Sequence, residues 1–200
     1  MTIGLRDLFR APITLDADGN EVYGKPVRMA KAIQAQLSIT TAEAKLFADD
    51  GVDEQVKEFV SGQLTLGVND LIPGEQAIVL GQKQDADGVL YASDADDPPY
   101  FAIGFRASKM RGRFKYLWFY KVKFAIPDEN FQTKGDSIAF NTPSIVGTIV
   151  KRDKDGKWKA DHVALASDPV AQKWFDEVRE FVKPTDPPPD PGDPGDPIDP

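Results

Sequence analysis

The sequence predicts a mainly β protein, a sandwich or barrel of antiparallel strands that occupies residues 1–183. Three observations predict it. Apolar and polar residues alternate with a period of two in several segments, Asp-Gly pairs at 18–19, 87–88 and 155–156 mark tight turns, and only two segments have a helical pattern. A chain of 200 residues with 41% hydrophobic side chains is long enough for one packed domain and a tail.

The first clear strand runs over residues 60–68. One face of this strand is expected to point inward and carries Val60, Gly62, Leu64, Leu66 and Val68. The other face carries Ser61, Gln63 and Thr65, which are polar. This alternation is typical of a strand with one buried face.

An aromatic hairpin is predicted over residues 100–124. Phe101, Ile103 and Phe105 alternate along its first strand, and a turn over 109–112 leads into the second. The second strand places on one face Phe114, Tyr116, Trp118, Tyr120, Val122 and Phe124. Leu117 and Phe119 lie on the opposite face among lysines, so we expect that face to be partly covered.

Two later strands are expected, over 137–140 and 145–150, with Pro143 marking a bend or an edge because proline cannot donate to a ladder. A short helix is predicted over 73–80, where Pro73 suits the first turn and Gly81 ends it. A longer C-terminal helix is predicted over 167–182 with Ser167 as its cap. Its apolar stripe (Val170, Trp174, Val178 and Phe181) should pack on the sheet, with docking on a neighbouring subunit as the alternative.

Residues 184–200 differ sharply in composition from the rest. They hold eight of the 16 prolines and five aspartates, with no cation. Such a segment cannot join a sheet or a helix, so we expect a disordered or extended, solvated linker. Its functional interpretation is a spacer that carries something further outward.

The composition excludes several classes of function. The chain has no cysteine and one histidine, His162, which excludes disulfide scaffolds, thiolate metal sites and two-histidine metal sites. His162 is expected at a surface or strand edge rather than as a general base. No apolar run is long enough to span a bilayer, and residues 1–10 lack the features of a signal peptide, so we expect synthesis in a cytoplasm. We expect neither a cofactor nor an enzymatic activity.

Two charged clusters are the strongest candidate sites. The acidic cluster is Asp49, Asp50, Asp53 and Glu54, which is typical of a solvated turn, although four carboxylates could also bind a cation or serve a hydrolase. The basic cluster lies between Arg106 and Lys123 and includes Arg106, Lys115, Lys121 and Lys123. It could bind nucleic acid through interleaved aromatics, or meet an acidic face of another copy of the chain. The acidic stretch at 16–21 fits a hairpin turn better than a calcium loop.

Several stretches together resemble one protein family. They are GLRDLFRAPITLDADGNEVYGKPVRMAKAI (4–33), FADDGVDEQVKEFVSGQLTLGVNDL (47–71), PYFAIGFRASKMRGRFKYLWFYKVKFAIP (99–127) and TKGDSIAFNTPSIVGTIV (133–150). In this order and spacing they resemble the major tail proteins of long-tailed, non-contractile bacteriophages of Gram-positive hosts. The resemblance covers residues 3–160, and the specificity lies in the ordered set rather than in one motif.

The resemblance implies a structural virion protein, the tail-tube subunit. Six copies of such a protein form a ring around an inner β-barrel, and the rings stack into a hollow tube. Its partners would be further copies of itself, the tape-measure protein, the tail terminator and the initiator or distal tail proteins, and DNA would pass without specific binding. The protein would be assembled in the host cytoplasm and reside in the phage tail. No catalytic residues carry over from the family.

A tube for DNA should not hold phosphates, so we expect the acidic cluster at the lumen or the joint between rings and the basic cluster away from the bore. The alternative function is a monomeric nucleic-acid or carbohydrate-binding β module that uses the aromatic hairpin at 100–124. A carboxylate hydrolase at 49–54 is a third hypothesis. Burial of the hairpin aromatics would count against the binding module.

Overall fold

The computed structural model describes residues 2–48, 51–127 and 142–182. The strand expected at 137–140, the tail at 184–200, and Asp49 and Asp50 lie outside the described residues. Within them the elements are β1 (Thr2–Leu15), β2 (Glu21–Tyr23), β3 (Val27–Ala30), β4 (Ala32–Ala48), β5 (Gly51–Val68), α1 (Pro73–Leu80), β6 (Lys83–Gln84), β7 (Leu90–Tyr91), β8 (Tyr100–Lys109), β9 (Arg113–Phe124), β10 (Ser144–Val150), β11 (Lys159–Leu165) and α2 (Pro169–Gln172).

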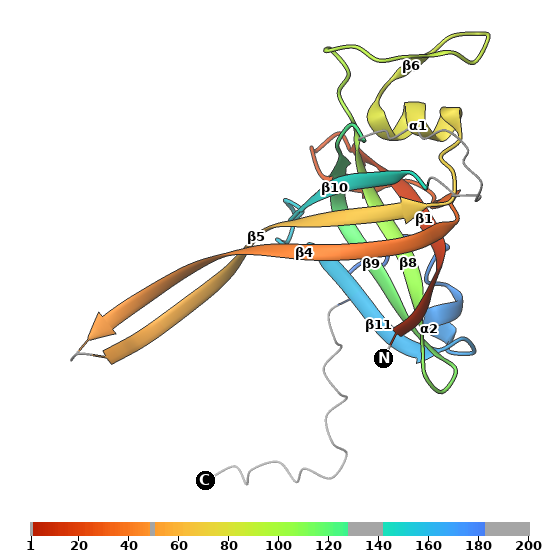
Figure 1. The fold of residues 1–200 in the computed structure, drawn as a ribbon. Helices are drawn as coiled ribbons and strands as arrows, with labels where there is room; N and C mark the ends of the chain where they lie inside the picture. The colour runs from red at the N-terminus through yellow and green to blue at the C-terminus, as the bar shows by residue number, and fades with distance from the viewer. Residues whose placement is uncertain (1, 49–50, 128–141, 183–200) are drawn as a thin grey trace, which may run out of the picture.

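The fold is mainly β, as the sequence predicts (Figure 1). In the described part of the chain nine strands form one antiparallel sheet with the order β2-β1-β8-β9-β10-β5-β4, while β3 pairs with β1 and β11 with β9. The sheet curls into a barrel-like body because the segment from Val27 onward pairs with two strands in turn. Val27–Ala30 pairs with β1. Strand β4 begins at Ala32, after the single residue Lys31, and pairs with β5.

Two apolar clusters lie on opposite faces of this sheet. The inner cluster draws buried side chains from β1, β3, β5, β8, β9 and β10, including Leu64, Ile103 and Phe119, and α1 adds Val79 and Leu80. The outer cluster lies over β1, β8, β9 and β11, where Trp118 packs with Trp174 of the C-terminal segment. Sheet strands β8 and β9 are therefore covered on both faces, which explains their continuous apolar character.

A β-bulge in β9 corrects the predicted face of the aromatic strand. Phe101 pairs with Val122, but Ile103 pairs with Phe119, so β9 has one residue more than β8 at this point. The extra residue reverses the alternation. The even-numbered side chains up to Tyr120 belong to the outer cluster, whereas Val122 and Phe124 belong to the inner cluster with Phe119.

A second bulge corrects the face predicted for Val60. The strand at 60–68 is confirmed as the end of a longer β5, and Leu64, Leu66 and Val68 are fully buried. Thr40 pairs with Ser61 and Thr41 with Phe59, so Val60 has no partner directly opposite and is 51% exposed. The bulge thus moves the inward face from Gly62 to Phe59, which packs against the inner cluster and stacks on Trp158.

The short helix over 73–80 is confirmed as α1, and Gly81 ends it in the left-handed conformation with φ of 67°. A Cβ at Gly81 would lie 2.4 Å from the carbonyl oxygen of Asp97. Only glycine therefore fits here, on grounds of both conformation and space. The predicted Asp-Gly turns are also confirmed, since Gly19, Gly88 and Gly156 all have positive φ.

The C-terminal helix predicted over 167–182 is wrong in length. The helix α2 covers only Pro169–Gln172, and its cap is Asp168, whose carboxylate accepts hydrogen bonds from the two backbone amides of Val170 and Ala171. Beyond it, two side chains of β9 donate hydrogen bonds to backbone carbonyls of the C-terminal segment. The indole of Trp118 donates to the carbonyl of Trp174 at 2.9 Å, and the hydroxyl of Tyr120 donates to that of Arg179 at 2.7 Å.

The predicted packing of the C-terminal stripe holds for half of its members. Trp174 and Val178 are buried against the sheet, whereas Val170 and Phe181 are exposed. The irregular backbone after Gln172 explains the difference, because it no longer brings every third or fourth side chain to one face.

Candidate assembly surface

The longest feature outside the barrel-like body is a two-stranded arm formed by the distal parts of β4 and β5 (Figure 1). The two strands pair in antiparallel register from Ala32 opposite Val68 to Ala48 opposite Gly51. Only the proximal part of β5 is also paired with β10, over Gly62–Gly67. We call residues 40–48 and 51–61 the arm.

The arm exposes backbone hydrogen-bonding groups along both of its edges. In the described part of the chain β4 pairs along its length with β5 alone, and β5 has no second neighbour over residues 51–61. An isolated two-stranded hairpin is marginally stable in water, and an open edge is a template for pairing with another chain. The arm therefore has the physical properties of an element that is completed by a partner.

The two faces of the arm differ in polarity. On one face Glu43 lies opposite Lys57, and its carboxylate is 3.3 Å from the Lys57 amine and 3.1 Å from that of Lys45. On the other face Ala44 lies opposite Val56, and both are exposed. Glu58, opposite Ala42, lies on this second face as well, so the arm has a salt-bridged face and a face that we call apolar for its exposed patch of Ala44 and Val56.

Two of the four residues of the predicted acidic cluster belong to strand β5 of the arm. Asp49 and Asp50 lie outside the described residues, while the backbone of Asp53 and Glu54 belongs to β5 close to the tip. The expected solvated turn at 49–54 is therefore strand from residue 51 onward. The assignment of these four residues to a lumen or a ring joint stays a prediction.

The four predicted basic residues each have an acidic partner within the chain. Arg106 pairs with Asp7, Lys115 with Asp161 at 3.4 Å, and Lys123 with Asp97 at 2.5 Å. Lys121 pairs with both Glu21 and Asp153, at 2.5 and 2.7 Å. Burial by itself lowers the pKa of Lys121, but the two carboxylates together outweigh this effect, so the pKa of Lys121 is raised.

The bulge in β9 also places these basic residues on different faces. Arg106 lies opposite Tyr116 and so shares the outer face, where its guanidinium lies 4.8 Å from the ring centre of Phe114. Lys121 and Lys123 follow the bulge and reach the same face, but Lys115 precedes it and lies on the face of Leu117. The four residues do not form one continuous face.

Four aromatic side chains of strand β9 are not available for stacking on a ligand. Tyr116, Trp118, Phe119 and Tyr120 are all at most 2% exposed. Base or sugar recognition by stacking requires exposed ring faces. Their burial counts against the hypothesis of a nucleic-acid or carbohydrate-binding module, although Tyr100 of the same hairpin is 37% exposed.

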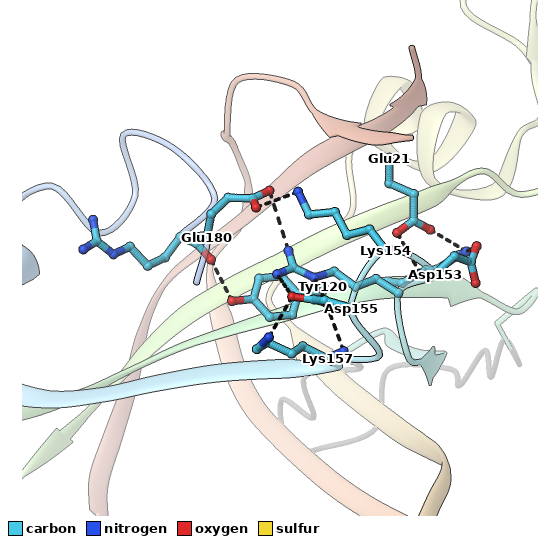
Figure 2. Close-up of polar contacts among 10 residues, drawn as sticks. Glu21, Tyr120, Asp153, Lys154, Asp155, Lys157 and Glu180 are labelled. Carbon is cyan, nitrogen blue, oxygen red and sulfur yellow. Dashed lines mark hydrogen bonds and ion pairs between the residues drawn. The ribbon is translucent and has the colours of Figure 1, made fainter. Parts of the chain in front are cut away.

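A buried ion network joins the C-terminal segment to the turn between β10 and β11 (Figure 2). Arg152 is fully buried, donates to both carboxylate oxygens of Asp155 at 2.6 and 2.7 Å, and lies 4.1 Å from the ring centre of Tyr120. Glu180 of the C-terminal segment approaches Lys154 at 2.6 Å and Arg152 at 3.6 Å. The network holds this segment against the sheet after α2 has ended.

The network changes the proton affinities of its members. The hydrogen bond from Arg152 lowers the pKa of Asp155, against a smaller opposing effect of burial. Burial raises the pKa of Tyr23, which lies beside Arg152, to about 12. Both groups therefore keep a single charge state in the fold across the neutral range.

His162 lies on β11 as a half-buried residue, in agreement with its expected place near a strand edge. Its Nε2 is 3.5 Å from the carboxylate of Asp168, and its ring stacks against Trp174 with the ring centres 5.8 Å apart. Both contacts join β11 to the C-terminal segment, so His162 contributes to the packing of this segment.

The described residues contain no group of three or more histidines, aspartates or glutamates placed to hold a metal ion. In the same part of the chain no helix has the length and hydropathy that a membrane span requires. No family model matches this chain, and no curated protein is similar to it in sequence.

Two functional features were not found in the sequence. Strand β4, which continues into the arm, could have been detected, because Ile33, Ala35, Leu37 and Ile39 alternate with polar residues as a strand requires. The burial of Arg152 could not, since residues 151–157 have the composition of an ordinary charged turn.

Proposed function

We propose that this chain is a structural subunit of a bacteriophage tail tube, which assembles with copies of itself into stacked, hexameric rings that surround a channel for the genome. The observation that carries the proposal is the arm, whose two backbone edges have no partner in the described residues. The ordered set of stretches that resembles the major tail proteins gives the proposal its specific form.

The arm supports self-assembly in a way that a monomeric binding module does not explain. It extends away from the barrel-like body, so its apolar face packs on no part of the described chain (Figure 1). Exposed strand edges are normally short, charged or covered in monomeric proteins, because they promote association. A neighbouring copy would cover the apolar face and complete the edges.

Negative-stain electron microscopy of the concentrated protein tests the proposal. We expect rings or hollow tubes, alone or after addition of the tape-measure protein. A protein that stays monomeric at every concentration under both conditions would contradict the proposal.

A pair of neighbouring substitutions tests the role of the arm. Val56→Glu places a charge opposite Ala44 on the apolar face, which already carries Glu58, whereas Gln55→Glu places the same charge opposite Lys45 on the salt-bridged face. We expect Val56→Glu to prevent assembly and Gln55→Glu, which can pair with Lys45, to leave it intact, since burial of an unpaired charge in an interface is costly. Equal effects of the two variants would exclude the apolar face as the contact.

A further inference from the structure

The two ends of strand β8 carry opposite charges. The acidic end is the segment 85–97 that precedes β8, and it contains five aspartates and no cation. The basic end is the turn between β8 and β9, where Lys109, Arg111 and Arg113 occur within five residues and without an acid. Figure 1 shows the β6 region at the upper end of the molecule and the β8–β9 turn at the lower end.

Most of the acidic end is uncompensated. Among the described residues, Asp97 pairs with Lys123, but no ion pair involves Asp85, Asp87, Asp94 or Asp96. Asp87 and Asp94 are exposed. Val89 and Tyr91 are about half-exposed on the hairpin between them, so the acidic end includes apolar side chains that a contact would bury.

The basic end has an unusual backbone as well as an unpaired charge. Arg111 and Gly112 have φ of 63° and 68°, the conformation of a two-residue hairpin turn in which asparagine and glycine are preferred. An arginine in this position costs stability, so its side chain indicates a role outside the fold. No ion pair within the described residues involves Lys109, Arg111 or Arg113, and Met110 beside them is 60% exposed.

The two ends are too far apart to neutralise each other in one molecule. Strand β8 has ten residues, which corresponds to roughly 30 Å between its ends. Charges at this separation are screened, because the Debye length is about 8 Å at physiological ionic strength. The opposite charges can act on each other only between molecules.

We infer that the acidic end of one copy binds the basic end of the next copy, so that the partner of each end is a second copy of this chain. This inference rests on the proposed function and identifies the chemistry of the joint between stacked rings. A contact between two different surfaces of one molecule repeats without closing and produces an open stack. Charges around exposed apolar side chains are the arrangement expected of a specific interface.

A nucleic acid is the competing partner for the basic end. Two observations favour a second copy instead. The matching acidic end belongs to the same chain, and Tyr116 and Trp118, which follow the basic turn, are buried and cannot stack on bases. Phe114, beside the turn, is half-buried, and the Arg106 guanidinium lies 4.8 Å from its ring centre.

Charge reversal at each end tests the inference in the full chain. One variant is Arg111→Glu with Arg113→Glu, and the other is Asp87→Lys with Asp94→Lys, which avoids Asp85 and Asp96 because their carboxylates accept hydrogen bonds from backbone amides. The control is Lys25→Glu with Lys151→Glu, two exposed lysines elsewhere, which changes the net charge as much as the arginine variant does. Assembly is measured as the threshold concentration by sedimentation, with electron microscopy of the pellets.

We expect each reversal to raise the threshold concentration about tenfold or more, since several ion pairs are replaced by repulsion. The chain that combines both reversals should assemble near the wild-type threshold, because attraction is restored with exchanged signs. The control should assemble like the wild type, and added salt should weaken wild-type assembly.

The inference is overturned if wild-type protein forms tubes and the reversals leave the threshold unchanged, or if the control impairs assembly equally. It is also overturned if Arg111→Glu with Arg113→Glu abolishes binding of a labelled oligonucleotide without affecting assembly. A wild-type chain that forms neither rings nor tubes contradicts the proposed function itself, so the two failures are distinguishable.

Discussion

Replacement of Arg152 by methionine removes the centre of the buried ion network but keeps a side chain of similar length on Tyr120. The loss comprises two charge-assisted hydrogen bonds to Asp155, of about 1.5–3 kcal/mol each, and a cation–π contact of up to about 2 kcal/mol. The variant also no longer has to desolvate a buried guanidinium, which offsets several kcal/mol of this loss. We expect a net loss of about 3 kcal/mol, or a decrease of roughly 6–12 °C in Tm.

Urea unfolding followed by tryptophan fluorescence measures this loss, because Trp118 and Trp174 are buried in the layer that the network holds in place. The matched control is Lys123→Met, whose partner Asp97 has a side chain 85% exposed. An exposed pair contributes less than about 1 kcal/mol. If Arg152→Met destabilises the protein no more than Lys123→Met, the network does not anchor the C-terminal segment.

Three further predictions concern single groups. Gly104→Ala should destabilise the protein by about 1–3 kcal/mol in urea unfolding, because the added Cβ would lie 2.7 Å from the buried ring of Trp118, whereas Gly4→Ala, with no atom within 4 Å, should be close to neutral. Asp155→Asn should lower the free energy of unfolding most at neutral pH. The pKa of Asp155 is lowered in the fold, so the contribution of its carboxylate to stability is complete above about pH 5. This contribution decreases as the pH falls below the unfolded value near 4. A difference in stability from wild type that does not shrink in acid would contradict this prediction. Tyr23→Phe should reduce the loss of stability in alkali. Burial raises the pKa of Tyr23 to about 12, so the unfolded chain ionises first and stability decreases above about pH 10, which phenolate absorbance and unfolding at several pH values can measure.

Local sequence patterns predicted the elements whose structure depends on near neighbours. The buried face of residues 62–68, the two strands of the aromatic hairpin and the Asp-Gly turns follow from alternation and from backbone preferences. Helix α1 was predicted because Pro73 and Gly81 specify its two ends. Each of these signals acts within a few residues.

The incorrect predictions arise where distant residues compete with local preference. The sequence over 167–182 has a helical pattern, but the helix ends at Gln172, and beyond it the carbonyls of Trp174 and Arg179 accept hydrogen bonds from Trp118 and Tyr120. The β9 bulge moved Val122 and Phe124 to the other face, a change that depends on register against β8. Pattern analysis has no access to either contact.

The candidate assembly surface was predicted only in part. The sequence located acidic and basic clusters, but it did not show that Asp53 and Glu54 belong to a strand of the arm or that Arg106, Lys115, Lys121 and Lys123 are paired within the chain. Charge is a property of the side chain, whereas its compensation depends on which segments meet in the fold.

The sequence by itself determined the mainly β class, the absence of cysteine chemistry and the positions of most turns, because alternation, composition and backbone preference are local properties. The tertiary structure alone decided the closure of the sheet through Val27–Ala30, the burial of Arg152 and the projection of the arm. These depend on pairing between segments far apart in the chain, which is fixed only when hydrogen bonds and apolar surface are satisfied together.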